Sequence, residues 1–255
     1  MLYFGSFNPV HRGHLALAEY VLRQGLCDSV ALVVSPHNPT KEEGSLLPEL
    51  ARFEMAEIAC RESAFPEAIQ ASAVEFLLPR PSYTINTLRF LQENNGADMR
   101  FSILMGADNI EIFHKWREYE AILEQYDIYV YPRSGYSAEK YADKIHFLAD
   151  APILDCSSTD IRKAIAEGRD VSQMLTAGVA EHIRKNGFYS RGTGEGEFAE
   201  LKAKGLGHFR RNEWGEALNA FRKVLKHRPD DTESAEYVKM IEEILEFRYK
   251  DIYNP

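Results

Sequence analysis

Short runs of apolar residues alternate with stretches of helical apolar spacing along the first 190 or so positions of the chain. The runs predict strands at Leu2–Phe4, Ser29–Ser35, Ala68–Val74, Arg100–Met105 and Asp127–Tyr131. The helical stretches predict helices at His14–Arg23, Leu47–Arg61, Thr84–Glu93, Trp116–Gln125, Thr159–Glu167 and Met174–Lys185. Apolar strands that alternate with helices predict an α/β fold, a Rossmann-like parallel sheet with helices on both faces.

The pattern changes after residue 189. Residues 190–196 contain several glycines and predict a linker. Residues 197–255 hold no strand candidate and many charged residues, so they predict a small all-α C-terminal extension. The chain is therefore expected to consist of one large domain, residues 1–189, and this helical addition.

The C-terminal segment resembles a single tetratricopeptide repeat. With Phe198 as the first position and Pro229 as the proline that ends the second helix, Gly205, Ala217 and Phe221 take the small and aromatic positions. Leu201, His208 and Val224 differ from the residues that are commonest at the corresponding positions of a tetratricopeptide repeat. A further helix is predicted at Thr232–Tyr249, and a generic helical hairpin remains the alternative. A lone repeat buries little apolar surface, so we expect residues 197–255 to pack on the first domain, a second copy of the chain or a protein partner.

Composition and charge narrow the class of protein. The 255 residues are 45% hydrophobic and 27% charged, which is ordinary for a globular protein. The 30 Lys and Arg against 39 Asp and Glu give a formal charge of −9, which argues against nucleic-acid binding by bulk charge. A local cationic pocket for a small anion is compatible with this charge.

Cysteine usage and hydropathy exclude further classes. Cys27, Cys60 and Cys156 are an odd number without a Cys-x-x-Cys pair, so neither a disulfide framework nor a structural zinc site is indicated. The sequence has no apolar run of membrane-spanning length, and Met1 leads directly into a motif. We expect a cytoplasmic protein without a membrane or nucleic-acid partner.

The stretch from Gly5 to His14, GSFNPVHRGH, is the most informative part of the chain. A predicted strand runs into a glycine turn, and a helix begins near residue 12. Gly5 allows backbone N–H groups to approach a phosphate, and the helix N-terminus adds donors. His11 and His14 can face one anion, donating to its oxygens more strongly when protonated. A metal held by these histidines is less favoured because no acidic ligand follows closely, so no protein-held metal is predicted.

This stretch resembles the His-x-Gly-His signature of the nucleotidyltransferase superfamily, and its Gly-Ser-Phe-Asn-Pro form resembles the nicotinate/nicotinamide mononucleotide adenylyltransferases. The resemblance covers about residues 1–189, with Phe4 in place of a first glycine. It implies that ATP lies over Gly5, Ser6, Phe7, His11 and His14. A mononucleotide phosphate would attack the α-phosphorus in line and release pyrophosphate without a covalent enzyme intermediate. It also implies Mg²⁺ carried by ATP and held by phosphate oxygens and water.

Two other segments carry the resemblance on the ATP side. Ser157-Ser-Thr-Asp-Ile-Arg162 predicts a helix start capped by Ser158 or Thr159, and the family motif implies that Ser158, Thr159 and Arg162 hold the β- and γ-phosphates. Arg162 thereby joins His11 and His14 as a candidate catalytic residue. Gly106 and Asp108 follow a strand end, where the resemblance implies contact with the ribose and adenine. A plain capped helix and a plain turn are the alternatives.

The acceptor side is expected around an aromatic residue and a helix start. Trp116 offers a flat face for a heterocycle, and the helix that begins at Thr84 offers N–H donors to an anion. The resemblance implies that Trp116 stacks on a pyridine ring while the Tyr83–Thr84 segment holds its carboxylate, with Arg117 close by. The alternative for Trp116 is an ordinary core residue.

Two loop cations complete the candidate set. Lys41 follows the second predicted strand and Arg133 follows the fifth. The resemblance implies that Lys41 reaches the phosphates and that Arg133 holds the phosphate of the mononucleotide. Either residue is equally compatible with a solvated loop cation. The sequence as a whole predicts an adenylyltransferase that joins ATP and nicotinate mononucleotide. The alternatives are another acceptor, such as nicotinamide mononucleotide or pantetheine phosphate, or a non-catalytic interaction protein of tetratricopeptide type.

Overall fold

The structure, a computed structural model, describes residues 1–36, 46–96, 98–153, 156–190 and 195–252. These residues divide into two compact units. One unit comprises Met1–Ile165 and Arg169–His182, and the other comprises Ala166–Gly168 and Ile183–Pro255. The first holds the sheet and the second holds the C-terminal helices.

The described part of the first unit is built on a six-stranded sheet with the order β3-β2-β1-β4-β5-β6. Its strands are β1 (Leu2–Gly5), β2 (Val30–Val34), β3 (Ile69–Ser72), β4 (Ser102–Gly106), β5 (Asp127–Tyr131) and β6 (His146–Phe147). All neighbouring pairs are parallel, which confirms the predicted sheet. The sequence pattern missed β6, because its two residues are exposed and form a strand only by pairing with Tyr129 and Val130.

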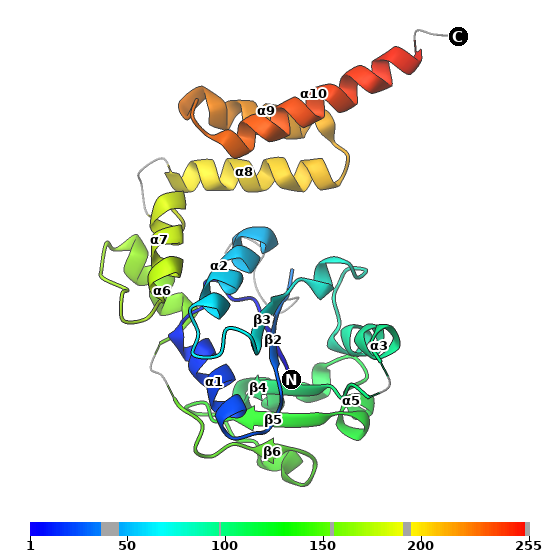
Figure 1. Ribbon diagram of the computed structural model, residues 1–255, viewed down its shortest axis with the longest axis vertical. Helices are drawn as coiled ribbons and strands as arrows, with labels where there is room; N and C mark the ends of the chain where they lie inside the picture. The colour runs from blue at the N-terminus through cyan, green and yellow to red at the C-terminus, as the bar shows by residue number, and fades with distance from the viewer. Residues whose placement is uncertain (37–45, 97, 154–155, 191–194, 253–255) are drawn as a thin grey trace. The chain divides into compact units, whose positions relative to one another are not determined.

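Helices connect the strands and cover both faces of the sheet. The helices of the sheet-containing region are α1 (Arg12–Arg23), α2 (Glu49–Arg61), α3 (Thr84–Asn94), α4 (Ala107–Glu111), α5 (Tyr119–Gln125), α6 (Ser158–Ala166) and α7 (Ala177–Asn186). The short 3₁₀ turns are η2 (Val74–Phe76), η3 (Phe113–Lys115) and η4 (Glu139–Lys144). Figure 1 shows α1 and α2 on one face and α3 and α5 on the other, as the apolar strands predict.

The core explains why the strands are apolar throughout. On the side of α3 and α5, a buried cluster joins the strands to both helices through Val33, Ile85, Ile103, Ile122 and Ile128. On the other side, α2 packs mainly on β3 and β2. Each central strand therefore buries side chains in both directions, and burial of this apolar area is the main force that holds the layers together.

Two predicted elements whose residues line the smaller cavity, or lie next to those that do, have other bounds in the structure. The helix predicted at Trp116–Gln125 begins only at Tyr119, because Trp116 is extended at ψ 143° and Glu118 adopts a left-handed conformation at φ 51°. Trp116 therefore lies in the turn after η3 and not on a helix. The strand predicted at Ala68–Val74 ends at Ser72, and η2 follows it.

The helices that lie wholly in the second unit are α8 (Glu195–Arg210), α9 (Trp214–His227) and α10 (Thr232–Ile252). Its core holds Leu206, Ala217, Phe221 and Ile241. A Cβ on Gly205 would lie 2.9 Å from Phe221 Cζ, so the glycine lets α8 approach α9 closely. The all-α prediction is confirmed. The predicted linker 190–196 is too long, since α8 begins at Glu195, and residues 191–194 lie outside the described residues.

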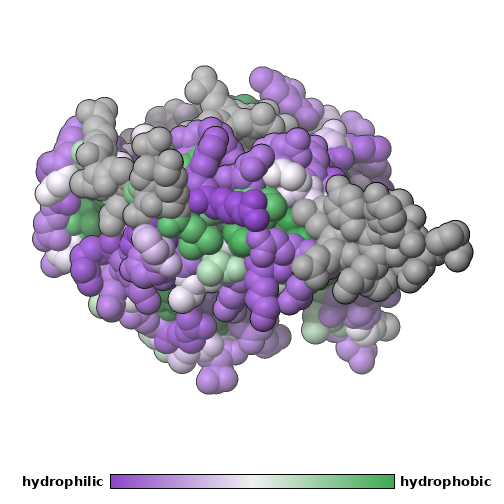
Figure 2. All heavy atoms as spheres, turned by 90° about the horizontal axis from the view of Figure 1, so that it is seen from above, coloured by the Kyte–Doolittle hydropathy of each residue, from purple (hydrophilic) through white to green (hydrophobic). Residues whose placement is uncertain are grey.

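The surface of the protein is mostly hydrophilic on the face shown in Figure 2, where hydrophobic side chains appear between charged and polar ones. Among the residues that the structure describes, no helix has the length and apolar character needed to cross a membrane.

A buried arginine on α2 fastens the loops that follow β1 and β2. Arg52 is 0% exposed, and its guanidinium donates to the carbonyl oxygens of Ser6 at 2.5 Å and Ser35 at 2.8 Å. It also donates to the carbonyls of Leu47 and Pro36, both at 2.9 Å. Backbone oxygens thus take the place of water around a buried charge, and the two loops keep fixed positions.

Replacing Arg52 with methionine is expected to lower the free energy of unfolding by about 3 kcal/mol or more, because several buried carbonyls lose their donors together. Urea unfolding of the full chain measures this change. Arg80→Met is the matched control: Arg80 is largely exposed and pairs with Glu49 at 2.8 Å. The control is expected to cost at most about 1 kcal/mol. Equal losses in both variants would contradict a special role for Arg52.

Candidate active site

Two cavities open at the carboxyl ends of β1 and β4. Their volumes are about 460 Å³ and about 220 Å³. Phe4, Gly5, Ser6 and Asn109 line both cavities, so the cavities meet at the end of β1. In the strand order, β1 and β4 are neighbours whose connections leave in opposite directions. Open parallel sheets bind ligands at this point of reversal.

The glycine turn after β1 is shaped by a packed aromatic ring. Phe7 is 2% exposed and adopts a positive φ of 44°. A Cβ on Gly5 would lie 2.9 Å from Phe7 Cζ. Glycine at position 5 therefore does more than expose backbone N–H groups to a ligand, because it also leaves the space that the ring of Phe7 occupies.

His11 and His14 cap α1 reciprocally. The Nδ1 atom of His11 accepts a hydrogen bond from the Gly13 backbone N–H at 3.1 Å. The Nδ1 atom of His14 accepts one from the His11 backbone N–H, also at 3.1 Å. The two imidazole rings stack with centroids 3.7 Å apart. Both rings line the larger cavity.

The caps determine which ring nitrogen carries the proton. When the Nδ1 atom of a neutral imidazole accepts a hydrogen bond, its proton resides on Nε2 and can be donated. Burial, together with the positive charge of Arg133, lowers the pKa of His11 to about 4. At neutral pH His11 is therefore an uncharged hydrogen-bond donor. The sequence alone allowed either an uncharged or a protonated imidazole.

The start of α6 lies on the same cavity. Ser157 caps this helix, since its Oγ accepts from the Asp160 N–H at 3.1 Å, so the predicted caps Ser158 and Thr159 are wrong. The helix begins one residue earlier than predicted, at Ser158, whose hydroxyl instead donates to the Pro9 carbonyl at 2.9 Å. Arg162 donates to the Asn8 carbonyl at 2.8 Å and to Thr159 Oγ1 at 3.2 Å.

A charged pair also lines the larger cavity. Asp108 Oδ1 and Arg133 Nε lie 3.8 Å apart, and both buried atoms have no hydrogen-bond partner among the described residues. The Arg133 guanidinium lies 5.4 Å from the centre of the Tyr131 ring. A Cβ on Gly106 would collide with Asp108 Oδ1. Polar atoms held in place without partners are suited to a polar ligand.

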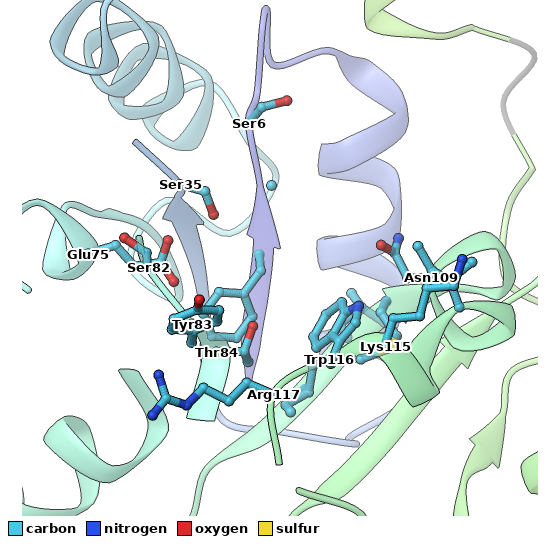
Figure 3. A pocket seen from close by; sticks show the side chains of 16 residues that line it. Ser6, Ser35, Glu75, Ser82, Tyr83, Thr84, Asn109, Lys115, Trp116 and Arg117 are labelled. Atoms are coloured by element: carbon cyan, nitrogen blue, oxygen red, sulfur yellow. The ribbon is translucent and has the colours of Figure 1, made fainter. Parts of the chain in front are cut away.

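The smaller cavity combines aromatic walls with polar groups. Trp116 packs on Phe113 with ring centroids 5.0 Å apart, and the Arg117 guanidinium lies 4.9 Å from the centre of the Tyr83 ring. Figure 3 shows Tyr83 on one side of the cavity and Trp116 with Lys115 on the other. A flat ring fits between such walls.

Sequence reasoning missed two polar residues of this cavity. Glu75 lies on η2, is 2% exposed and accepts a hydrogen bond from Thr87 Oγ1 at 3.0 Å. Ser82 Oγ is buried and has no hydrogen-bond partner among the described residues. No local sequence pattern indicates either residue, because their place at the cavity depends on how η2 and the turn before α3 fold after β3.

The structure brings most of the predicted site residues together. The larger cavity is lined by Gly5, Ser6, Phe7, His11, His14, Asp108, Arg133, Ser158, Thr159 and Arg162. The smaller one is lined by Gly5, Ser6, Tyr83, Thr84, Trp116 and Arg117. Arg133, predicted to bind the acceptor, thus lies with the histidines. Gly106 lines neither cavity but precedes α4, and Lys41 lies outside the described residues.

A metal ion would find few ligands among the described side chains. They include no group of three or more His, Cys, Asp or Glu residues arranged to hold a metal. Asp108 is the one carboxylate among the described residues that line the larger cavity. Such a site fits a divalent ion that arrives with phosphate oxygens and water as its main ligands.

The family model and the related proteins that match this chain point to the same family. The cytidylyltransferase-like family model matches residues 2–164. A Flavobacterium johnsoniae protein named a probable nicotinate-nucleotide adenylyltransferase is 43% identical over 194 residues, covering 74% of this chain and 98% of that protein. A Bacteroides fragilis protein of the same name is 40% identical over 184 residues, covering 71% of this chain and 89% of its own length.

Solved structures agree on the fold. The Plasmodium falciparum nicotinic acid mononucleotide adenylyltransferase, complexed with NaAD, has a TM-score of 0.64 and 17% identity, covering 74% of this chain and 95% of that one. The matches to the related protein from F. johnsoniae and to this solved structure each leave about a quarter of the present chain uncovered. The chain therefore belongs to the cytidylyltransferase-like family and, within it, to the nicotinate-nucleotide adenylyltransferases.

Proposed function

We propose that this protein transfers the adenylyl group of ATP to nicotinate mononucleotide, giving deamido-NAD and pyrophosphate, a step in NAD biosynthesis. The observation that carries the proposal is the pair of cavities that meet at Gly5 and Ser6. One has donors suited to phosphates and the other has aromatic walls suited to a pyridine ring. The reacting phosphates would lie where the cavities join.

The larger cavity is proposed to hold the ATP triphosphate. His11, uncharged at neutral pH, and His14 would donate through Nε2 to its oxygens. The start of α6 would supply backbone N–H groups and Arg162. Arg162 already donates to the Asn8 carbonyl beside the histidines, so its guanidinium lies near that loop. Ser6, Phe7, Ser158 and Thr159 complete the proposed phosphate site.

The part of this cavity near Asp108 is proposed to bind the nucleoside part of ATP. The unpartnered oxygen of Asp108 is an acceptor for a ribose hydroxyl. Gly106 leaves room for that carboxylate. Arg133 would bind phosphate on the same side, and the role proposed for Lys41 rests on its sequence position alone.

In the proposed reaction the protein positions the two substrates and stabilises charge, and it forms no covalent bond with either of them. The mononucleotide phosphate would attack the α-phosphorus in line, and negative charge would move onto the leaving pyrophosphate. His11 and His14 would stabilise the reacting phosphate, while Arg162 would stabilise the leaving group. No side chain forms a covalent bond in this scheme, so the residues act by holding two anions in line.

Mg²⁺ is proposed to accompany ATP. Bound to phosphate oxygens, it would neutralise part of the triphosphate charge. The scarcity of carboxylates among the described cavity residues supports an ion held mainly by phosphate and water, with Asp108 as the nearest protein oxygen donor.

The smaller cavity is proposed to hold the pyridine ring against Trp116. The first turn of α3, next to Tyr83 and Thr84, offers backbone donors to the ring carboxylate. Arg117 holds Tyr83 through a cation–π contact and adds positive charge at this cavity.

His14→Ala is expected to lower kcat by about 100-fold or more, because it removes a donor aimed at the reacting phosphate. Steady-state pyrophosphate release measures the change. His146→Ala is the matched control, since His146 is exposed and pairs with Asp127 at 3.3 Å. The control is expected to retain nearly full activity. Wild-type turnover by the His14 variant would contradict the proposed role.

The acceptor preference is tested by comparing the acid and amide mononucleotides under the same conditions. We expect kcat/KM for nicotinate mononucleotide to exceed that for the amide at least about tenfold. Hydrogen bonds to a charged carboxylate are stronger than those to an amide, and a difference of about 1.4 kcal/mol corresponds to tenfold. Pantetheine phosphate is expected to give no product. An equal or reversed preference between the two mononucleotides would overturn the assignment of the acid as substrate.

The helical extension is proposed to be a tetratricopeptide-type module that mediates self-association or contact with a protein partner. Its hairpin core contains Gly205, Ala217 and Phe221, the residues that carry this resemblance. The relative from F. johnsoniae aligns over 98% of its length while about a quarter of this chain remains unmatched. A catalytic unit without the extension is thus consistent with the family.

Removal of residues 197–255 is therefore expected to leave kcat and KM within about twofold and to change the oligomeric state or solubility, because these helices lie outside both cavities. Size-exclusion chromatography with light scattering, alongside the turnover assay, measures both properties. A folded but inactive truncation would contradict this separation of roles.

A further inference from the structure

Glu75 is a buried carboxyl group that the proposed chemistry does not use. It lies on η2, just after β3, and lines the smaller cavity although it is only 2% exposed. Figure 3 shows Glu75 and Ser82 on the same side of this cavity. Ionisable groups are rarely buried in a ligand cavity without a functional consequence.

Two hydroxyl groups bond to this carboxyl from separate elements. Thr87 on α3 donates to Glu75 Oε1 at 3.0 Å. Ser35, directly after β2, forms a side-chain hydrogen bond with Glu75. Hydroxyls bond to a carboxyl group in either protonation state, so neither contact requires Glu75 to be charged.

The charged surroundings of Glu75 are sparse among the described residues. Burial raises the pKa of Glu75, and the bonds from Ser35 and Thr87 offset part of that rise. The first turn of α3 carries no acidic side chain. The charged groups that line the same cavity are Lys115 and Arg117, and Tyr83 is its other titratable group. On α2, the buried cation Arg52 bonds to the carbonyl of Ser35. Among the described residues that line this cavity, Glu75 is the one carboxylate until a ligand brings another.

The proposed substrate would bring such a neighbour. Thr87, the partner of Glu75, lies one turn into α3, the helix whose start is proposed to receive the ring carboxylate. A cavity of about 220 Å³ leaves little room to separate two carboxyl groups. Two carboxylates that share a small, partly desolvated site do not both remain ionised, and one of them takes up a proton. The amide form of the ring carries no such charge.

We propose that Glu75 binds a proton when the acid mononucleotide enters the smaller cavity, so that the chain accepts an anionic pyridine by neutralising its own carboxylate. This inference rests on the proposed function. A protonated Glu75 also has an O–H group to donate toward the substrate carboxylate, which converts a repulsive contact into an attractive one. Selection of the acid form is thereby coupled to pH, whereas binding of the amide is not coupled through Glu75.

The direction in which the affinity for the acid mononucleotide changes with pH follows from the coupling of its binding to proton uptake by Glu75. At pH values below the pKa of Glu75 in the free protein, the proton is already present and acid binding takes up none. Above that pKa, each acid molecule bound requires a proton, so its affinity falls as the pH rises, by up to about tenfold per pH unit. The ratio of the acid and amide dissociation constants isolates this effect, because the 5′-phosphate titrates in both ligands.

The experiment is isothermal titration calorimetry of the full chain with each mononucleotide, from pH 5.5 to 8.5, in buffers that differ in ionisation enthalpy. The dependence of the observed enthalpy on the buffer gives the number of protons bound. We expect the acid to take up more protons than the amide, with a difference that approaches about one. In Glu75→Gln, which keeps the size of the side chain, this difference is expected to vanish and the affinity ratio to become independent of pH.

Glu49→Gln is the matched control. Glu49 is a mostly buried glutamate that lines neither cavity, so its replacement is expected to leave the proton difference unchanged. The wild-type measurement decides the question even where the Glu75 variant does not fold. Equal proton uptake for acid and amide, or a difference that survives Glu75→Gln, would overturn this inference alone. A chain that binds the amide and not the acid would overturn the proposed function and this inference with it.

Discussion

The reciprocal cap at the start of α1 is the constraint on which the rest of the site depends. The Nδ1 atoms of His11 and His14 accept the Gly13 and His11 backbone N–H groups, so helix formation itself sets which nitrogen of each ring carries a proton. A Cβ on Gly13 would lie 2.9 Å from His11 Nδ1, and only glycine leaves this cap undisturbed. The histidine spacing is thus a matter of helix geometry as much as of ligand binding. The two residues that cap the N-terminus of α1 also line the larger cavity.

The rigid sheet explains why one end of β1 can serve both cavities. Gly5 ends β1 beside β4, and its carbonyl accepts from the Ser35 N–H at 2.9 Å, so the turn is fixed to β2 as well. Across the sheet, Tyr3 and Tyr131 share a hydrogen bond of 3.0 Å between their hydroxyls. The glycine turn that both cavities share therefore follows a strand that is paired or bonded to its neighbours. In the proposed reaction the two anions would meet at this turn, so in-line transfer would need little motion of the sheet.

The parts that the sequence predicted are those that local patterns encode. The strand, glycine turn and capped helix from Gly5 to His14 are contiguous, and so is the helix start before Arg162. Their sequences identify the elements, and the family resemblance associates them with one ligand. By contrast, Trp116 was expected on a helix, and only the left-handed Glu118 shows why it lies in a turn. No periodicity signals a single non-glycine residue in that conformation.

The parts that escaped prediction depend on contacts between distant segments. Arg52 sits in a helical pattern like any solvated arginine, and its burial becomes evident only when the loops of Ser6 and Ser35 supply carbonyls to it. Glu75 likewise follows a strand with no local sign that Thr87 will bond to it. Burying a charge is costly, so a chain that does so twice next to one site must satisfy each group through the folded structure and not through adjacent residues.

Ser35 joins these two buried groups. Its carbonyl accepts from Arg52, and its hydroxyl bonds to Glu75, which lines the smaller cavity. Its N–H, in turn, donates to the Gly5 carbonyl at the turn shared by both cavities. One residue thus contacts the buried guanidinium of Arg52, the buried carboxyl group of Glu75 and the glycine turn. If Glu75 changes its charge when the acceptor binds, as proposed, Ser35 is the residue through which that change would reach the turn that the two cavities share.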